Sequence, residues 1–294
     1  MPFFDLGNFI RAAQMLLQGR DIYLLPDVYY PLPVYLIFIP LAGLPLPVAC
    51  AVWSAIEILI LVAILRRRAL AVILFMPVFL TFLMGQVVMP MLGLFALLRQ
   101  GKFGGMALGL LVLKPQLVIF VVPWMLWQWW KNNRRQLVWF ALTVALWGMA
   151  AFIVQPNWLE RWLAVSGRRL RAPISPSLWG LLSFLPIQVW VTIVGLATLG
   201  IFIWVWHKND FDLIAASGFL VNPLSISYDL TLLTVLLRDT RAWLVLMLIS
   251  WLSFALSAFW LNEGVYVLTT LAVVVMLVQQ KRRIIEQARF GGRE

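Results

Sequence analysis

The stretch 48–65, with the sequence VACAVWSAIEILILVAIL, is followed directly by Arg66-Arg67-Arg68, and these two features decide the fold. Its single charged residue is Glu57, and its length is close to the roughly 20 apolar residues that a membrane-spanning helix needs. Lys and Arg gather on the cytoplasmic side of such helices. The stretch therefore predicts a transmembrane helix whose C-terminal end faces the cytoplasm.

The composition of the whole chain supports the same interpretation. Of its 294 residues, 63% are hydrophobic and 12% are charged, and the mean hydropathy is +0.93. A soluble domain contains about 45–50% apolar and about 25% charged residues, so this composition excludes an ordinary soluble protein. We predict an all-α polytopic membrane protein.

Apolar runs continue along the rest of the chain, separated by short polar or basic segments. Counting 48–65, we identify eleven candidate spans, the others being 69–84, 87–98, 103–113, 117–130, 137–154, 189–206, 213–221, 229–237, 244–260 and 265–278. Several are shorter than the roughly 20 residues of a straight crossing, so we expect them to be tilted or partly buried. The expected architecture is a bundle of about 11 transmembrane helices.

The net charge of +11 comes from basic clusters that lie between these runs. A nucleic-acid-binding protein would gather its Lys and Arg on one face, so we expect no nucleic-acid partner. Placing Arg66–Arg68 in the cytoplasm puts the clusters at 99–102, 131–135, 207–208, 238–241 and 281–283 on the same side. The expected location is the cell membrane, with the C-terminus in the cytoplasm.

Residues 1–47 fall on the opposite, extracytoplasmic face, where we expect an external loop, and 48–294 then form a single membrane domain. Within the loop, apolar residues recur at helical spacing and predict an amphipathic helix on the membrane surface; they are Leu6, Phe9, Ile10, Ala13, Leu16 and Leu17. The run 32–44 is about half a span long and contains Pro40, so we expect an interfacial or re-entrant helix there.

Most familiar catalytic motifs are absent from the sequence. It contains no nucleotide-phosphate loop, no paired-cysteine metal site, and no HExxH or GxSxG motif. The single histidine, His207, lies in a basic cluster, and the single cysteine, Cys50, lies in an apolar run. We therefore expect no cofactor and no histidine-dependent triad, and we identify no metal ligands.

Asp5 is the first candidate catalytic residue, because few other carboxylates occur along the chain. A carboxylate at a water–lipid boundary suits a base that accepts a proton from an acceptor hydroxyl. In the alternative, Asp5 caps the N-terminus of the amphipathic helix that follows it.

Cations on the outer face depart from the usual charge distribution and suggest an anionic ligand. Lys114 lies between apolar runs, and its alternative role is to snorkel to lipid headgroups. The loop 155–177 is unusually basic, and it suits a lipid phosphate or diphosphate or is simply a solvated loop; its arginines are Arg161, Arg168, Arg169 and Arg171.

Gln86, Tyr228 and Asp229 are polar residues at membrane depth or at its edge. Such residues are functional candidates by default, although hydrogen bonds between helices explain them equally well. In the predicted topology they share the outer face with Asp5 and Lys114.

Several short motifs are informative as an ordered set. Asp5 is followed by Gln18-Gly19-Arg20-Asp21-Ile22-Tyr23 and by Tyr30-Pro31-Leu32-Pro33. Further along come Gly85-Gln86-Val87, Leu113-Lys114-Pro115-Gln116, and finally Asn222-Pro223 with Tyr228-Asp229. Together these motifs resemble the GT-C membrane glycosyltransferases, in particular the polyprenol-phosphate-mannose-dependent mannosyltransferase-like family, also called DUF2029 or glycosyltransferase family 87.

The resemblance implies a GT-C-like hexosyltransferase that moves mannose or another hexose from a polyprenyl-phosphate donor to an acceptor on the extracytoplasmic face. Asp5 would hold the catalytic-base position. The implied substrate-binding residues are Tyr23, Tyr30, Gln86, Lys114, Gln116, Arg168, Arg169, Arg171, Tyr228 and Asp229. Lys114 and the arginines would neutralise the leaving phosphate, and a groove between spans would hold the prenyl tail. The implied partners are this donor and membrane lipids.

The family pattern places a transmembrane helix before the catalytic Asp, whereas Asp5 stands almost at Met1. We therefore expect either an apolar stretch of about twenty codons upstream of Met1 or a truncated, non-catalytic paralogue. A further alternative is a transporter or flippase for a lipid-linked or amphiphilic solute. Transporters often contain inverted repeats and ionisable residues near mid-membrane. The sequence shows no repeat, and Glu57 is its only carboxylate deep within a long run, so the transferase is favoured.

Overall fold

Helices form every regular element of the computed structural model, which describes residues 3–166, 175–237, 239–260 and 262–290. The first half contains α1 (Phe4–Leu17), η1 (Ile22–Leu24), α2 (Leu32–Leu36), η2 (Ile39–Leu41), α3 (Leu46–Leu65), η3 (Arg66–Arg68), α4 (Ala69–Val72), α5 (Met76–Met84), α6 (Val88–Arg99), α7 (Gly104–Leu111), η4 (Pro115–Leu117) and α8 (Val121–Asn132). The second half contains α9 (Arg134–Val154), α10 (Trp158–Ser166), α11 (Leu178–Leu181), α12 (Ile187–Lys208), α13 (Phe211–Leu220), η6 (Ser227–Val235), α14 (Thr240–Trp260), η7 (Glu263–Tyr266) and α15 (Val267–Phe290). The all-helical class is confirmed.

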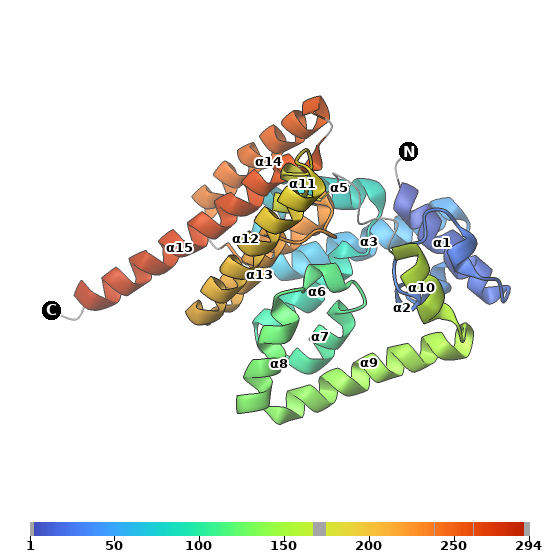
Figure 1. Cartoon of the computed structure of the whole chain (residues 1–294). Coiled ribbons are helices and arrows are strands. Elements are labelled where there is room, and N and C mark those ends of the chain that lie inside the picture. Colours follow the sequence, from blue (N-terminus) through green and yellow to red (C-terminus); the bar gives the residue numbers. More distant parts are fainter. Residues whose placement is uncertain (1–2, 167–174, 238, 261, 291–294) are drawn as a thin grey trace.

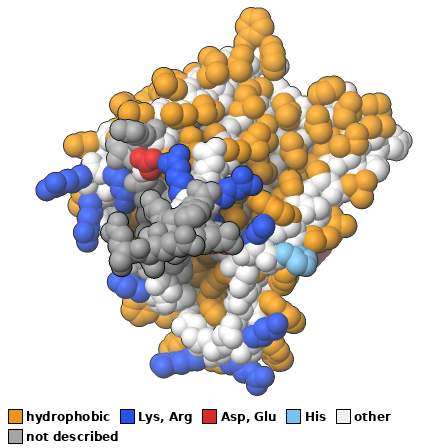
Figure 2. Space-filling model, turned by 90° about the vertical axis from the view of Figure 1, so that its left-hand side faces the viewer, with side chains coloured by type: hydrophobic (Ala, Val, Ile, Leu, Met, Phe, Trp, Pro, Cys, Tyr) orange, Lys and Arg blue, Asp and Glu red, His pale blue; other side chains and the backbone are white. Residues whose placement is uncertain are grey.

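Within the described residues, five helical segments are long and apolar enough to cross a membrane. They are Leu46–Val72, Arg134–Val154, Ile187–Lys208, Ala242–Trp260 and Glu263–Arg283. In Figure 1, α12, α14 and α15 lie on one side of the molecule, and α9 runs along another. Hydrophobic side chains cover much of the surface in Figure 2, while Lys and Arg side chains gather at its left and lower parts. This surface suits a protein embedded in lipid.

The remaining predicted spans are also helical but shorter. The helices α6, α7, α13 and η6 are largely buried, whereas α5 and α8 have exposed apolar residues such as Phe79 and Trp127. The run 69–84 is divided into α4 and α5, because Pro77 stands in the first turn of α5 and the chain turns before it. The run 229–237 falls largely within the 3₁₀ helix η6, which is buried over its whole length. A helix of this length does not reach across a bilayer of about 30 Å, so the number of crossings stays a prediction.

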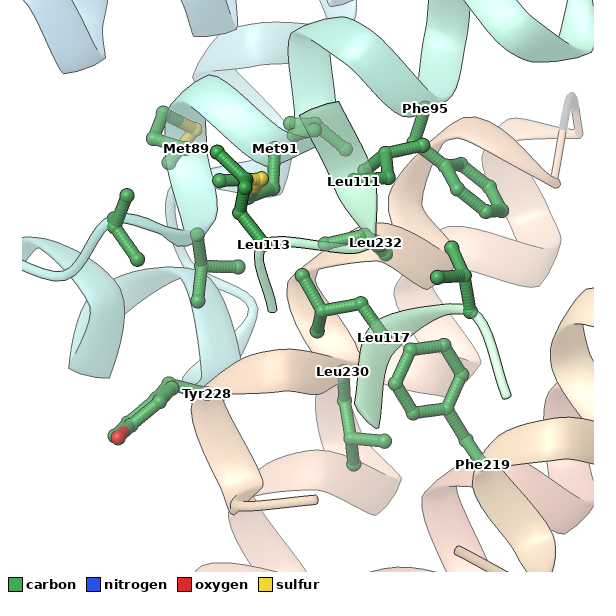
Figure 3. Close-up of a cluster of buried hydrophobic side chains, with 14 of the residues drawn as sticks. Met89, Met91, Phe95, Leu111, Leu113, Leu117, Phe219, Tyr228, Leu230 and Leu232 are labelled. Carbon is green, nitrogen blue, oxygen red and sulfur yellow. The ribbon is translucent and has the colours of Figure 1, made fainter. Parts of the chain in front are cut away.

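A cluster of large apolar side chains joins these short helices at the centre of the molecule. Figure 3 shows Met91 and Phe95 of α6 with Leu111 of α7, Phe219 of α13 and Leu232 of η6. All five are buried, with at most 2% of each residue exposed. Because lipid tails are as apolar as Leu, close packing of this kind is what holds helices together in a membrane. The cluster therefore holds η6 against α6.

The amphipathic helix predicted near the N-terminus is α1, and five of the six predicted apolar residues are buried. The prediction is wrong for Leu17, which is exposed because it stands in the last turn, where the helix ends. The buried face packs on protein: the Phe9 ring stacks on Phe38 at 4.5 Å, and the Gln14 amide donates to the Ala42 carbonyl at 2.9 Å. The run 32–44 forms two short helical segments, α2 and η2, and Pro40 lies in the first turn of the second. The Phe38 ring in turn lies 4.8 Å from the Trp53 ring of α3, so the N-terminal block is anchored on the helical bundle.

The helix α10 closes over this block from the far end of α9 (Figure 1). The Trp162 indole donates to the Tyr29 carbonyl at 3.0 Å. The Gln155 amide donates to Asp21 at 2.8 Å, and Arg161 lies 3.5 Å from the same carboxylate. The loop predicted on the outer face and the N-terminal block therefore lie together.

Candidate active site

Asp5 lies in the first turn of α1, and its carboxylate meets the side chain of Gln86. The Gln86 amide nitrogen donates to Asp5 Oδ2. Gln86 is buried, with 1% of the residue exposed. A backbone hydrogen bond of 2.7 Å from Phe3 N to Leu83 O joins the same two segments. The structure therefore brings together two predicted site residues that are 81 positions apart.

Gly85 makes this approach of α1 and α5 possible. It ends α5 with a φ of +66°, a backbone conformation that glycine adopts without steric cost. A Cβ placed on it would lie 2.7 Å from the Cβ of Leu6 and 3.1 Å from the Phe3 ring. Only a residue without a side chain lets α1 pack this closely on the turn that carries Gln86.

Lys114 and Asp229 form a second pair, buried at the start of η6. Lys114 Nζ lies 2.6 Å from Asp229 Oδ1, and neither side chain is exposed. The other carboxylate oxygen of Asp229 accepts from the Ile226 backbone N–H at 3.0 Å. Burial lowers the pKa of Lys114, but the Asp229 carboxylate and Tyr30 raise it by more, so the pKa lies above its ordinary value. The pair is therefore an ion pair.

Two tyrosine rings pack against the ammonium group of Lys114. Lys114 Nζ lies 5.1 Å from the centroid of the Tyr30 ring and 4.8 Å from that of Tyr228, within the range of cation–π attraction. The Tyr30 and Tyr228 hydroxyls are 3.3 Å apart, and the Tyr23 hydroxyl donates to the Tyr30 carbonyl at 3.2 Å. Burial raises the pKa of Tyr23, so its hydroxyl stays neutral. Five predicted residues thus form one connected group.

A cavity of about 310 Å³ lies where α1, α5, η6, α14 and η7 meet. It is lined by Phe4, Asp5, Leu80, Met84, Ile226, Ser227, Tyr228, Phe254, Ser257, Glu263 and Tyr266. In Figure 3 the Tyr228 hydroxyl points away from the apolar cluster. The cavity volume is at the lower end of the range of roughly 300–1,000 Å³ found for ligand pockets. The cavity combines apolar walls with a few polar groups, as such pockets do.

Glu263 is a residue of this cavity that the sequence interpretation did not select. It lies between the predicted spans 244–260 and 265–278, whose other ends carry the cytoplasmic clusters 238–241 and 281–283. The predicted topology therefore places it on the same face as Asp5, and this shared face was the pattern that could have identified it. Glu263 Oε2 is buried and has no hydrogen-bond partner among the described residues. The same holds for the Tyr266 hydroxyl.

The other predicted site residues lie apart from the cavity or outside the described residues. Gln116 is half-buried in η4, and its backbone carbonyl accepts from the Asn222 amide. This contact joins the Leu113-Lys114-Pro115-Gln116 motif to the Asn222-Pro223 motif. Arg168, Arg169 and Arg171 lie outside the described residues.

A search of the described ranges finds no group of three or more His, Cys, Asp or Glu side chains that could hold a metal ion.

Comparison with known proteins gives one result at the level of the family. No curated protein and no solved structure matches the chain. The family model of glycosyltransferase family 87 matches residues 29–227, which include Tyr30, Gln86 and Lys114, whereas Asp5 and Glu263 lie outside the matched segment. Because this match covers more than half of the chain, the protein belongs to glycosyltransferase family 87, a family of membrane glycosyltransferases.

Proposed function

We propose that the protein transfers a hexose from a polyprenyl-phosphate-linked donor to a hydroxyl acceptor on the extracytoplasmic face of the membrane. One observation carries the proposal: the Asp5 carboxylate, oriented by Gln86, lines a cavity that is otherwise largely apolar and aromatic. Membership of a glycosyltransferase family makes sugar transfer the reaction to test at this cavity.

In the proposed reaction, an oxygen of the acceptor attacks the anomeric carbon of the donor sugar. A new carbon–oxygen bond forms while the bond between that carbon and the phosphate oxygen breaks. The acceptor proton passes to Asp5, and the electron pair of the broken bond leaves with polyprenyl phosphate. Attack from the side opposite the leaving group inverts the configuration of the anomeric carbon.

Gln86 has a positioning role in this proposal. Its amide donates to one oxygen of Asp5, so the carboxylate is held in one orientation. A base must lie within hydrogen-bond reach of the proton that it accepts, and general-base catalysis of this kind contributes about 10²–10⁴-fold in rate. Fixing the carboxylate keeps that geometry when the substrate binds.

Lys114 has a supporting role, because its ammonium is already paired with Asp229 and enclosed by Tyr30 and Tyr228. To contact the donor phosphate it would have to exchange Asp229 for the phosphate. We therefore propose that the pair holds Tyr228 at the cavity wall. Binding of the donor phosphate is assigned to Arg168, Arg169 and Arg171 on the basis of their charge.

The test is sugar transfer by the purified full-length protein in proteoliposomes that contain polyprenyl-phosphate mannose or polyprenyl-phosphate glucose. The acceptor probes are methyl mannoside and a total membrane-lipid extract. Asp5→Asn is expected to lower the rate by about 10²-fold or more. The matched control is Asp27→Asn, since Asp27 is an exposed acid of the same N-terminal block.

Two results would overturn the proposal. Unchanged transfer by Asp5→Asn would remove Asp5 from the base position. Movement of the lipid-linked sugar across the bilayer by the unmodified protein, without transfer from either donor, would favour a flippase.

A further inference from the structure

We propose that Glu263 is a substrate-binding residue, and that the cavity it shares with Asp5 holds a neutral polyhydroxy group, the sugar-like acceptor, while the donor phosphate lies elsewhere. The inference rests on the proposed function, because it assigns the acceptor side of the same site. It adds a residue and a ligand class that the family resemblance does not supply.

The first argument is the position of two carboxylates on one cavity. Asp5 comes from α1 and Glu263 from η7, at opposite ends of the chain, and both line the space of about 310 Å³. Each carboxylate can accept hydrogen bonds from a ligand in this space. An occupant that donates hydrogen bonds to both is therefore favoured.

The second argument is the unused hydrogen-bonding capacity of the wall. Glu263 Oε2 can only accept when the carboxylate is ionised, and the Tyr266 hydroxyl can donate or accept. Both atoms are buried and lack a partner among the residues that the structure describes. A buried polar atom without a partner has a free-energy cost, because it has lost its hydrogen bonds to water. A polyol relieves this cost at both atoms, since each of its hydroxyls donates and accepts.

The third argument is the charge of the lining. Among the described residues that line the cavity there are two carboxylates but no Lys, Arg or His. A phosphate group placed here would meet like charges without a cation to balance it, and such contacts exclude a ligand. Phe4, Phe254 and Tyr228 instead offer apolar ring surfaces, against which the C–H groups of a sugar ring pack. These features select a neutral sugar.

The fourth argument is that Glu263 is held in place rather than solvated on a mobile loop. The Asn262 side chain accepts from Gly264 N at 2.7 Å and donates to the Gly180 carbonyl at 3.2 Å. A Cβ on Gly264 would lie 2.0 Å from Leu181 N, so η7 and α11 are in direct backbone contact. A fixed carboxylate suits binding, because little freedom is lost when the ligand arrives.

A purely structural role for Glu263 makes a different prediction. An acid in the first turn of a helix stabilises the helix N-terminus, and Glu263 stands at the start of the segment that continues as α15. If that were its function, Glu263→Gln would lower the melting temperature and leave the apparent affinity for the acceptor unchanged. The two roles therefore separate in binding measurements.

The experiment compares Glu263→Gln with the unmodified protein in proteoliposomes, using methyl mannoside and methyl glucoside as neutral probes and mannose 6-phosphate as the charged probe. Direct binding is measured by equilibrium dialysis, and transfer is measured with the donors named above. We expect the KM or Kd for the neutral acceptor to rise about tenfold or more, as for loss of a hydrogen bond to a charged group. The KM for the donor should stay within twofold.

Matched variants keep the test decisive. Glu160→Gln removes an exposed carboxylate on α10 and is expected to change neither constant. Tyr266→Phe removes only the unpartnered hydroxyl, so it tests the cavity if Glu263→Gln does not fold. The unmodified protein should bind mannose 6-phosphate at least tenfold more weakly than methyl mannoside.

The failure of this inference is distinguishable from failure of the proposed function. Active transfer with an unchanged acceptor constant in both Glu263→Gln and Tyr266→Phe would overturn the role of Glu263 and leave the transferase proposal standing. Binding of neutral sugars that depends on Glu263, without any transfer, would overturn the proposed function alone. No binding of either neutral probe by the unmodified protein, or preferred binding of the phosphorylated sugar, would overturn the inference.

Discussion

Lys114 Nζ lies 2.6 Å from Asp229 Oδ1, and the two side chains are fully buried although 115 positions separate them in the chain. This pair links the loop after α7 to the first turn of η6. Because Tyr30 and Tyr228 lie over the same ammonium, the pair also connects the N-terminal block to the wall of the cavity that contains Asp5.

Breaking this ion pair should destabilise the protein strongly. Lys114→Met leaves Asp229 as a buried charge without its partner, which costs about 3–5 kcal/mol. We expect a clear fall in the melting temperature in detergent. The double variant Lys114→Met with Asp229→Leu should recover a large part of the loss, because it removes both charges. Equal melting temperatures for Lys114→Met and the unmodified protein would contradict this account.

The contribution of the pair should fall at high pH. The folded pKa of Lys114 is raised above 10.5, so its stabilising effect is complete below the unfolded pKa and is lost as the pH rises through the folded pKa. The difference in melting temperature between the unmodified protein and Lys114→Met should therefore stay constant from about pH 6 to 9 and shrink above the ordinary lysine pKa. A difference that grows with alkaline pH would show the opposite sign of the pKa shift.

Gly85→Ala should separate α1 from the turn that carries Gln86. The left-handed conformation costs a residue with a Cβ roughly 1–2 kcal/mol, and the new Cβ would meet Leu6 at 2.7 Å. We expect lower stability together with lost transfer, since Asp5 moves with α1. Gly7→Ala is the control, because Gly7 lies in α1 and its Cβ would have open space around it. Full activity of Gly85→Ala would mean that the Asp5–Gln86 contact is not needed.

Gln86→Leu should lower the transfer rate more than the stability. The substitution keeps a side chain of similar size but removes the amide that donates to Asp5. We expect kcat to fall by about tenfold or more, as when a catalytic group loses its orientation, while the melting temperature changes little. Gln18→Leu, an exposed position at the end of α1, serves as the control. A fall in the melting temperature without a fall in kcat would assign Gln86 to packing.

The helical membrane class and most of the apolar face of α1 could be predicted from the sequence alone. Both follow from local patterns: the composition of each run decides its preference for lipid, and the 3.6-residue period places one face of a helix against its surroundings. The ordered motifs around Tyr30, Gln86 and Lys114 also identified the family, since they lie within the matched segment.

Which of these residues come into contact could not be predicted from the sequence and became visible in the folded chain. The pairing of Asp5 with Gln86, and of Lys114 with Asp229, depends on helix packing between distant parts of the chain. The folded structure also divides the run 69–84 into two helices, and it places Glu263 on the cavity that Asp5 lines. The physical reason is that hydropathy and periodicity report the surroundings of one segment, whereas a site is made by side chains whose contacts exist only after the segments have packed.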